Sequence, residues 1–274
     1  MTETEWFAPW RADEHCRLWP GSRPLLISLP HDGTELPQEI ADAMTPAARA
    51  VPDTDWHVSR LYDFARELGA FVLRPRWSRY VVDLNRPPDG GALYPGKSET
   101  GLCPTSTFAC ESIYLAGREP DAVEIRARVQ RYWQPYHTAL RESLAALQVR
   151  FGQVLLWEGH SIVGTCPLFF EGRLPDYNLG TAGGKSCARG LQRNLEQALT
   201  QCGVEHAVNG RFQGGYITRQ YGRPETGLNA VQMELVQENY MVEGAPFAYD
   251  EGRALDSQRI LQQVLESALA HLEQ

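Results

Sequence analysis

The chain has 274 residues with a formal net charge of −8, and 43% of its residues are hydrophobic. The hydrophobic fraction is sufficient for a substantial core, whereas the acidic balance argues against a nucleic-acid-binding protein, which usually carries a basic face. Because no linker or low-complexity stretch divides the sequence, we expect a single domain over residues 1–274, with the N-terminal segment 1–23 packed on it.

The sequence carries no sign of export or of membrane insertion. Residues 1–5 are polar and acidic, unlike a signal peptide, and no apolar run reaches the roughly 20 residues that span a bilayer. None of the six cysteines forms a C-x-x-C pair, which argues against zinc-finger and thioredoxin-like proteins. We therefore expect a cytoplasmic protein with reduced thiols, a monomer or small homo-oligomer, with no nucleic-acid or membrane partner.

Strands and helices alternate along the chain. In chain order, the hydrophobic patterns predict a strand at 25–29, short helices at 37–43 and 46–51, a helix at 57–68, strands at 70–73 and 80–84, a long helix at 121–151, a strand at 153–157, a helix at 187–201, strands at 204–208 and 230–236, and a helix at 254–272. This alternation predicts an α/β fold with a mostly parallel central sheet flanked by helices.

Two long irregular segments, 87–119 and 162–183, interrupt the pattern. Loops of this length in a compact domain often form a lid or a wall of a site. We therefore expect one of them to close over a bound ligand.

Two histidines lie at the ends of apolar runs. His31 follows the strand at 25–29, and His160 follows the run at 154–158. Since sites in open α/β sheets form at the strand ends, these imidazoles are candidate metal ligands. The alternative for each is an ordinary loop histidine.

A catalytic zinc site commonly adds a carboxylate to two histidines and leaves one position for water. The acidic residue could be Asp55, which could equally cap the helix that follows it. Asp32, Glu35 and His57 are rivals for the third position.

Glu234 is the leading candidate for a general base. It lies in the apolar run 231–236, where an ionised carboxylate is costly unless it is paired or functional. The alternative is a glutamate at the strand end that faces solvent.

Four arginines are candidate carboxylate-binding residues, because a guanidinium binds a carboxylate in a bidentate fork. They are Arg79, Arg86, Arg211 and Arg219. The alternative for each is a surface salt bridge, and Asp83 beside Arg86 is one candidate pair.

These segments together resemble the N-formylglutamate amidohydrolase (deformylase) family over residues 24–246. The resembling segments are 28–33 (SLPHDG), 54–58 (TDWHV), 78–88 (SRYVVDLNRPP), 94–96 (YPG), 100–104 (TGLCP), 132–137 (YWQPYH), 160–162 (HSI), 174–180 (LPDYNLG), 209–219 (NGRFQGGYITR) and 232–235 (QMEL). Their number, order and spacing make the resemblance specific.

The resemblance implies a metal-dependent hydrolase that splits N-formyl-L-glutamate into formate and L-glutamate in histidine degradation. It also implies a fold similar to the zinc carboxypeptidases, of the phosphorylase/hydrolase-like type. In such enzymes two histidines and a carboxylate hold the metal, an Asn-Arg pair binds the substrate carboxylate and a late glutamate is catalytic. The chain offers His31, Asn85 with Arg86, His160 and Glu234 in that order.

The chain departs from the family pattern at two places. Zinc carboxypeptidases carry a glutamate three residues after the first histidine, where this chain has Thr34, so the resemblance implies Asp55 as the third ligand. Glu158-Gly159 replaces the usual Asp-Ala or Asp-Leu pair before His160. We expect Glu158 either to orient His160 through its second ring nitrogen or to lie beside the water, and Ser161 to donate a hydrogen bond near that histidine.

The expected cofactor is one divalent ion, Zn²⁺ before Fe, Co or Mn, and the expected partner is a small dicarboxylate substrate. Three alternatives remain from the sequence. They are an amidohydrolase for another N-acyl amino acid, a carboxypeptidase-like enzyme, and a non-catalytic carboxylate-binding protein.

Overall fold

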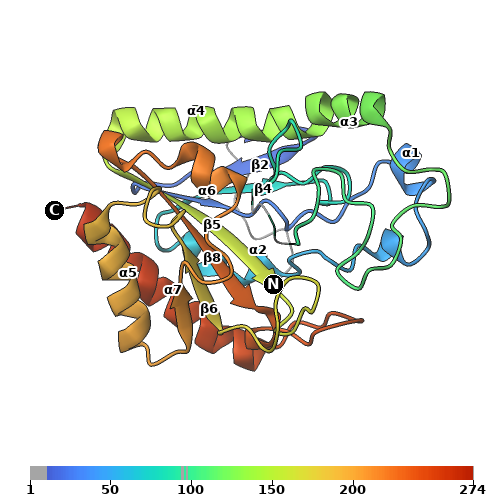
Figure 1. The fold of residues 1–274 in the computed structure, drawn as a ribbon. Helices are drawn as coiled ribbons and strands as arrows, with labels where there is room; N and C mark the ends of the chain where they lie inside the picture. The colour runs from blue at the N-terminus through green and yellow to red at the C-terminus, as the bar shows by residue number, and fades with distance from the viewer. Residues whose placement is uncertain (1–10, 94–95, 97, 274) are drawn as a thin grey trace.

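A computed structural model describes residues 11–93, 96 and 98–273 of the chain, and one eight-stranded sheet runs through this part (Figure 1). The strand order is β1-β2-β4-β3-β5-β8-β6-β7. The strands are β1 (Arg11–Ala12), β2 (Cys16–Trp19), β3 (Leu25–Ser28), β4 (Phe71–Pro75), β5 (Val154–Ile162), β6 (Tyr177–Gly180), β7 (His206–Val208) and β8 (Leu228–Val236).

The four central strands β4, β3, β5 and β8 are parallel. At one side β2 pairs antiparallel with β4, and at the other β6 pairs antiparallel with β8. The predicted α/β class with a mostly parallel centre is therefore confirmed. The carboxyl ends of the central strands meet at one edge of the sheet, which is where ligands bind in such folds.

Helices cover both faces of the sheet (Figure 1). They are α1 (Gln38–Ala41), α2 (Val58–Leu61), α3 (Ala122–Arg128), α4 (Gln134–Phe151), α5 (Arg189–Gln201), α6 (Tyr216–Tyr221) and α7 (Glu251–Leu272), with 3-10 turns at Ala48–Ala50, Asp63–Ala65, Pro224–Thr226 and Gln237–Asn239. Figure 1 shows α4 along one face and α5 and α7 on the other.

The central strands are buried on both faces, which explains their nearly continuous apolar runs. Along β3, Leu25 and Ile27 pack into the core under α5 and α7, whereas Leu26 packs into the core under α4. β5 and β8 are buried along their whole length. Their polar residues therefore need partners inside the protein.

The predicted strand at 80–84 is wrong. Val81 donates its N–H to the Ser78 carbonyl over 2.9 Å, so the segment is a turn. Tyr80, Val81 and Val82 are nevertheless buried in the core under α4. Their β-branched and aromatic side chains are typical of buried positions, and buried positions occur in turns as well as in strands.

Three other boundaries differ from the sequence prediction. The predicted helix at 57–68 is divided into α2 and the 3-10 turn Asp63–Ala65. The predicted loop 162–183 contains the strand β6, and β5 extends to Ile162, so His160 lies inside a strand. The N-terminal segment contributes β1 and β2 to the sheet; its first ten residues lie outside the described residues.

The predicted long helix at 121–151 is confirmed and contains a π-helical turn, η4 (Val129–Trp133), between α3 and α4. No helix in the described part of the chain is both long and apolar enough to cross a membrane. All six cysteines, each within the described residues, are free thiols.

Candidate active site

The two predicted histidines meet at the carboxyl edge of the central sheet. β3 and β5 are parallel neighbours, with Ser28 opposite Glu158. His31 follows β3 in a turn, and His160 points from the end of β5, so their ring centroids lie 4.7 Å apart. Both imidazoles are buried.

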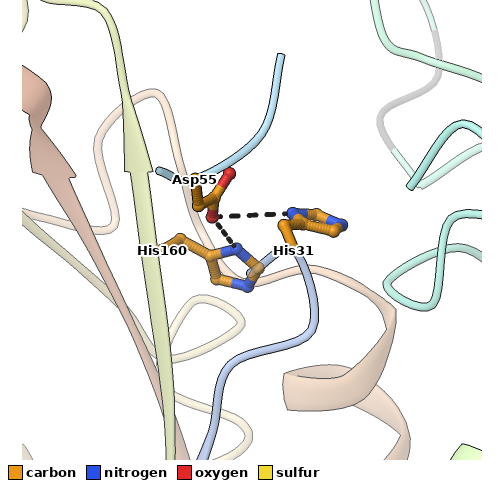
Figure 2. Close-up of side chains that lie close together, drawn as sticks. All are labelled: His31, Asp55 and His160. Atoms are coloured by element: carbon orange, nitrogen blue, oxygen red, sulfur yellow. Dashed lines mark hydrogen bonds and ion pairs between the residues drawn. The ribbon is translucent and has the colours of Figure 1, made fainter. Parts of the chain in front are cut away.

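Asp55 completes a cluster with the histidines. Its Oδ2 lies 3.0 Å from His160 Nδ1 and 3.7 Å from His31 Nδ1 (Figure 2). One potential ligand atom from each of the three residues lies within 4.8 Å of the others. Two backbone bonds hold Asp55 there, because its N–H donates to the His31 carbonyl and its carboxylate accepts the N–H of Ser161.

The rival third residues have other partners. Asp32 pairs with Arg74 and accepts the N–H of Ser59, so Asp32, and not Asp55, binds the first turn of α2. Glu35 forms an exposed pair with Arg76. The His57 ring bonds to the carbonyl of Phe247. None of these three joins the cluster in the described part of the chain.

A buried carboxylate accepts the second N–H of each imidazole. His31 Nε2 donates to Asp83 over 2.7 Å, and His160 Nε2 donates to Glu158 over 2.9 Å. The other oxygen of Glu158 accepts the hydroxyl and the backbone N–H of Thr218. These contacts leave Nδ1 of each ring directed at Asp55 within the cluster, an arrangement typical of metal-bound histidines.

Sequence reasoning missed the contact between Asp83 and His31. The predicted Asp83–Arg86 pair is not formed: Asp83 binds Arg79 over 2.8 Å, and Arg86 donates to Thr100. A carboxylate in an apolar run was the signal that identified Glu234, and the same signal in YVVDL could have identified Asp83.

The charges of the cluster follow from burial and from these pairs. Burial and the nearby Arg79 lower the pKa of His31, which keeps it neutral. For His160 burial also disfavours the charge, but hydrogen bonds to Asp55 and Glu158 outweigh it and raise its pKa to about 10. Burial opposes the charge on Asp83 as well, yet His31, Arg79 and Arg86 hold its pKa well below the usual range.

A cavity opens above the cluster, with about 550 Å³ of space that includes its open mouth. The predicted residues that line it are His31, Arg79, Asn85, Arg86, His160, Ser161, Arg211 and Glu234. Asp55, Glu158 and Arg219 are not among the described residues that line it. Asp55 and Glu158 bond to His160 Nδ1 and Nε2, and Arg219 binds the carbonyl of Gly214.

Glu234 lies next to His160 in the register of β5 and β8. It is buried rather than facing solvent, and burial raises its pKa to about 8. Gln232 donates to its Oε2 over 3.1 Å and accepts the N–H of Gly215 over 2.7 Å. A carboxyl group with such a pKa, at the wall of a cavity, is suited to proton transfer near neutral pH.

Asn85 is packed against Gly215 so closely that a side chain there would collide with it. A Cβ on Gly215 would lie 2.3 Å from Asn85 Nδ2. The Asn85 Oδ1 accepts the N–H of Ile217, and its Nδ2 lies 3.1 Å from His160 Nε2. Glycine at position 215 therefore lets the Asn85 amide reach the histidine side of the cavity.

Three arginines of the described residues line the cavity. Arg79 is buried beneath Phe108, and its Nε has no hydrogen-bond partner among the described residues. Arg86 is held by the carbonyl and hydroxyl of Thr100. Arg211 donates to the carbonyls of Phe169 and Ser98, which lie in the two predicted long loops.

The donor set fits a divalent transition metal. Two imidazole nitrogens and one carboxylate suit Zn²⁺ and its neighbours in the first transition row better than Ca²⁺ or Mg²⁺, which prefer oxygen ligands. The Nε2 atoms of both histidines are bonded to carboxylates, Asp83 and Glu158, as is typical of metal-bound histidines.

The sequence pattern of the N-formylglutamate amidohydrolase family matches residues 23–241. Curated N-formylglutamate deformylases from Pseudomonas putida and Pseudomonas aeruginosa are 46% and 48% identical over 251 residues, which are 91% of this chain and 94% of each relative. The crystal structure of an N-formylglutamate amidohydrolase from Ralstonia eutropha superposes with a TM-score of 0.80 at 28% identity, covering 97% of this chain and 98% of that one.

Proposed function

Because the chain belongs to the N-formylglutamate amidohydrolase family, we propose that it hydrolyses N-formylglutamate to formate and glutamate. The observation that carries the proposal is the His31–Asp55–His160 cluster at the base of a cavity that also presents Glu234 and arginines. The cluster supplies a site for a metal, Glu234 a proton acceptor, and the arginines positive charge for a dicarboxylate.

In this proposal His31 Nδ1, Asp55 Oδ2 and His160 Nδ1 hold one divalent ion, Zn²⁺ before Fe, Co or Mn. When bound, the ion supplies Lewis-acid activation of water and of the formyl carbonyl. Asp83 and Glu158 bind the Nε2 atoms and so keep both imidazoles oriented with Nδ1 toward the cluster.

Glu234 takes the proton from the attacking water and passes it to the amide nitrogen as the C–N bond breaks. Its burial beside His160 and its raised pKa of about 8 support both steps, because the same group must accept and then release a proton. The hydrogen bond from Gln232 leaves the other carboxyl oxygen of Glu234 for this exchange.

Arg79 stabilises the negative charge that develops on the formyl oxygen. Its buried Nε–H lacks a protein partner among the described residues, and Arg79 lines the cavity. The remaining guanidinium nitrogens are held by Asp83 and the Asp53 carbonyl, so the group is oriented before substrate arrives.

Asn85, Arg86 and Arg211 bind the two carboxylates of the substrate. Each of these arginines donates to neighbouring backbone or hydroxyl oxygens and lines the cavity. A pocket with several arginines suits a dicarboxylate better than a monocarboxylate, because each carboxylate needs its own charged partner.

The test is formate release by the purified, metal-loaded chain from N-formylglutamate, with N-formylaspartate as the shorter homologue. N-acetyl- and N-succinylglutamate, followed by glutamate release, test the acyl group. We expect N-formylglutamate to have the highest kcat/KM. A higher value for another N-acyl compound would contradict the substrate assignment, and binding without turnover of any compound would contradict catalysis.

A further inference from the structure

The segment YWQPYH at 132–137 contains two aromatic residues that the proposed mechanism does not use. Trp133 ends the π-helical turn η4, and His137 lies in the first turn of α4. Four residues apart on one helical face, their rings stack with centroids 3.6 Å apart and planes at 16°. Neither is among the described residues that line the cavity.

Both side chains donate to the backbone on either side of Asn85. Trp133 Nε1 donates to the Arg86 carbonyl over 3.0 Å, and His137 Nε2 donates to the Leu84 carbonyl over 2.8 Å. Since a carbonyl only accepts, the His137 proton lies on Nε2. Its Nδ1 then accepts the hydroxyl of Tyr221 over 2.9 Å.

The backbone that these bonds hold carries the proposed substrate-binding residues. Its N–H groups are fixed by Asp83, whose carboxylate binds the Asn85 N–H and whose carbonyl accepts the Arg86 N–H. The Asn85 carbonyl accepts the N–H of Tyr216. Trp133 and His137 thus hold the two carbonyls that flank Asn85 in the sequence.

The π-helical turn places the two donors. A π turn inserts one extra residue into a helix and changes which side chains share a face, and such turns are frequent at functional sites. Here the insertion ends at Trp133, so the face of α4 beyond it, with His137, is directed at the segment 84–86.

We propose that Trp133 and His137 are positioning residues for substrate carboxylate binding. They fix the backbone at Leu84 and Arg86, so that the Asn85 amide and the Arg86 guanidinium are placed before the substrate enters. The inference rests on the proposed function only in taking Asn85 and Arg86 as substrate-binding residues. The backbone contacts of Trp133 and His137 do not depend on it.

The decisive variant is Trp133→Phe, which keeps an aromatic ring beside His137 and removes the indole N–H together with part of the ring, a loss that the control Trp77→Phe shares. We expect KM for N-formylglutamate to rise about fivefold with kcat within about twofold of wild type, since one hydrogen bond that orders a binding segment is lost. Trp77→Phe is the matched control, because Trp77 donates to His15 and is not among the described residues that line the cavity. Equal KM values for the two variants would overturn the proposal.

A conservative pair of variants tests His137. His137→Gln keeps an amide N–H able to reach Leu84, and His137→Leu does not. We expect KM to rise in His137→Leu and to return most of the way to the wild-type value in His137→Gln.

A double-mutant cycle tests whether Trp133 acts through Arg86. Trp133→Phe should raise KM little further in the Arg86→Ala background, because both substitutions affect the same binding segment. Full additivity would overturn the proposal.

Hydrogen exchange separates this inference from the proposed function. The backbone amides of the peptide covering 83–86 should exchange faster in Trp133→Phe than in wild type. In Trp77→Phe their exchange rate should equal that of wild type, whatever substrate the enzyme accepts. If wild type releases no formate but the exchange difference appears, the proposed function fails and the positioning role stands. If exchange is the same in all three proteins, the positioning role fails.

Discussion

The floor and the mouth of the cavity are built in different ways. The floor, defined as His31, Asp55, His160 and Glu234, is at most 7% exposed at any residue. Its side chains bond to other buried side chains, among them Asp83, Glu158 and Gln232. The mouth, defined as Arg86, Arg211 and their partners Ser98, Thr100 and Phe169, is held through loops and backbone carbonyls.

The difference between floor and mouth follows from the structural elements that carry their residues. Two floor residues, His160 and Glu234, lie side by side on paired strands, where strand register fixes their side chains. His31 lies in a turn and Asp55 in a loop, and buried hydrogen bonds to Asp83 and His160 hold them. The mouth joins the segments 98–100, 169–170 and 211–212, which belong to no helix or strand. We therefore expect floor substitutions to remove chemistry or metal, and mouth substitutions to weaken substrate binding.

The largest effect is expected for Glu234→Gln. Loss of the proton acceptor should lower kcat about a thousandfold, within the range for general bases, while bound metal is unchanged. Steady-state formate release together with metal analysis measures both quantities. Glu238→Gln, at an exposed position just beyond β8, is the control and should retain wild-type kcat. A Glu234→Gln enzyme with full turnover would show that another group is the base.

The next effect is expected for Asp55→Asn. Replacing the carboxylate of the three-residue cluster should lower metal affinity more than about a hundredfold. Loss of a hydrogen bond to a metal ligand lowers metal affinity by about 10- to 100-fold, and loss of a ligand should exceed that. Competition with a chromogenic chelator measures the affinity. Asp32→Asn changes a neighbouring carboxylate that lies outside the cluster and should leave the affinity unchanged.

Arg211 and Arg219 provide a comparison within the mouth. Arg211→Ala should raise KM for N-formylglutamate about tenfold, since a charged hydrogen bond to substrate is lost. Arg219→Ala should change KM less than about threefold, because Arg219 binds Gly214 and is not among the described residues that line the cavity. Steady-state kinetics at fixed metal loading measures both, and the reverse ranking would show that Arg219 is the substrate-binding arginine.

The smallest effect concerns acid stability away from the floor. Burial lowers the pKa of His137 to about 3, so below its unfolded value of about 6.5 the unfolded chain binds a proton that the folded chain does not. Stability therefore falls as pH falls. Between pH 7 and pH 5, wild type should lose about 2 kcal/mol more unfolding free energy than His137→Gln. Urea unfolding at both pH values measures this difference, and identical losses would show that His137 does not titrate on unfolding.

The fold was largely predictable where burial and secondary structure coincide. The predicted strands at 25–29, 153–157 and 230–236 are mostly apolar runs, and each forms a central strand. The prediction failed at 80–84, where the same composition fills a buried turn. It also missed β6, a four-residue strand just after Pro175 that is recognisable only through its pairing with β8.

The site was predictable as a set of residues and less so as a set of contacts. The resemblance placed Asp55 with His31 and His160, which spacing alone left open among several acidic residues, and the three side chains do lie together. The Glu158–Thr218 contact and the Asp83–His31 bond were not predictable, because they join segments 60 and 52 residues apart. Local sequence patterns do not predict contacts between residues so far apart in the chain.

The central claim is that the floor holds a metal ion required for hydrolysis of N-formylglutamate. The most direct measurement is formate release as a function of metal added back to chelator-treated protein, with His160→Ala measured beside it. We predict no formate release without metal, recovery that saturates near one equivalent, and no recovery in His160→Ala. Full formate release from the metal-free protein would contradict the account.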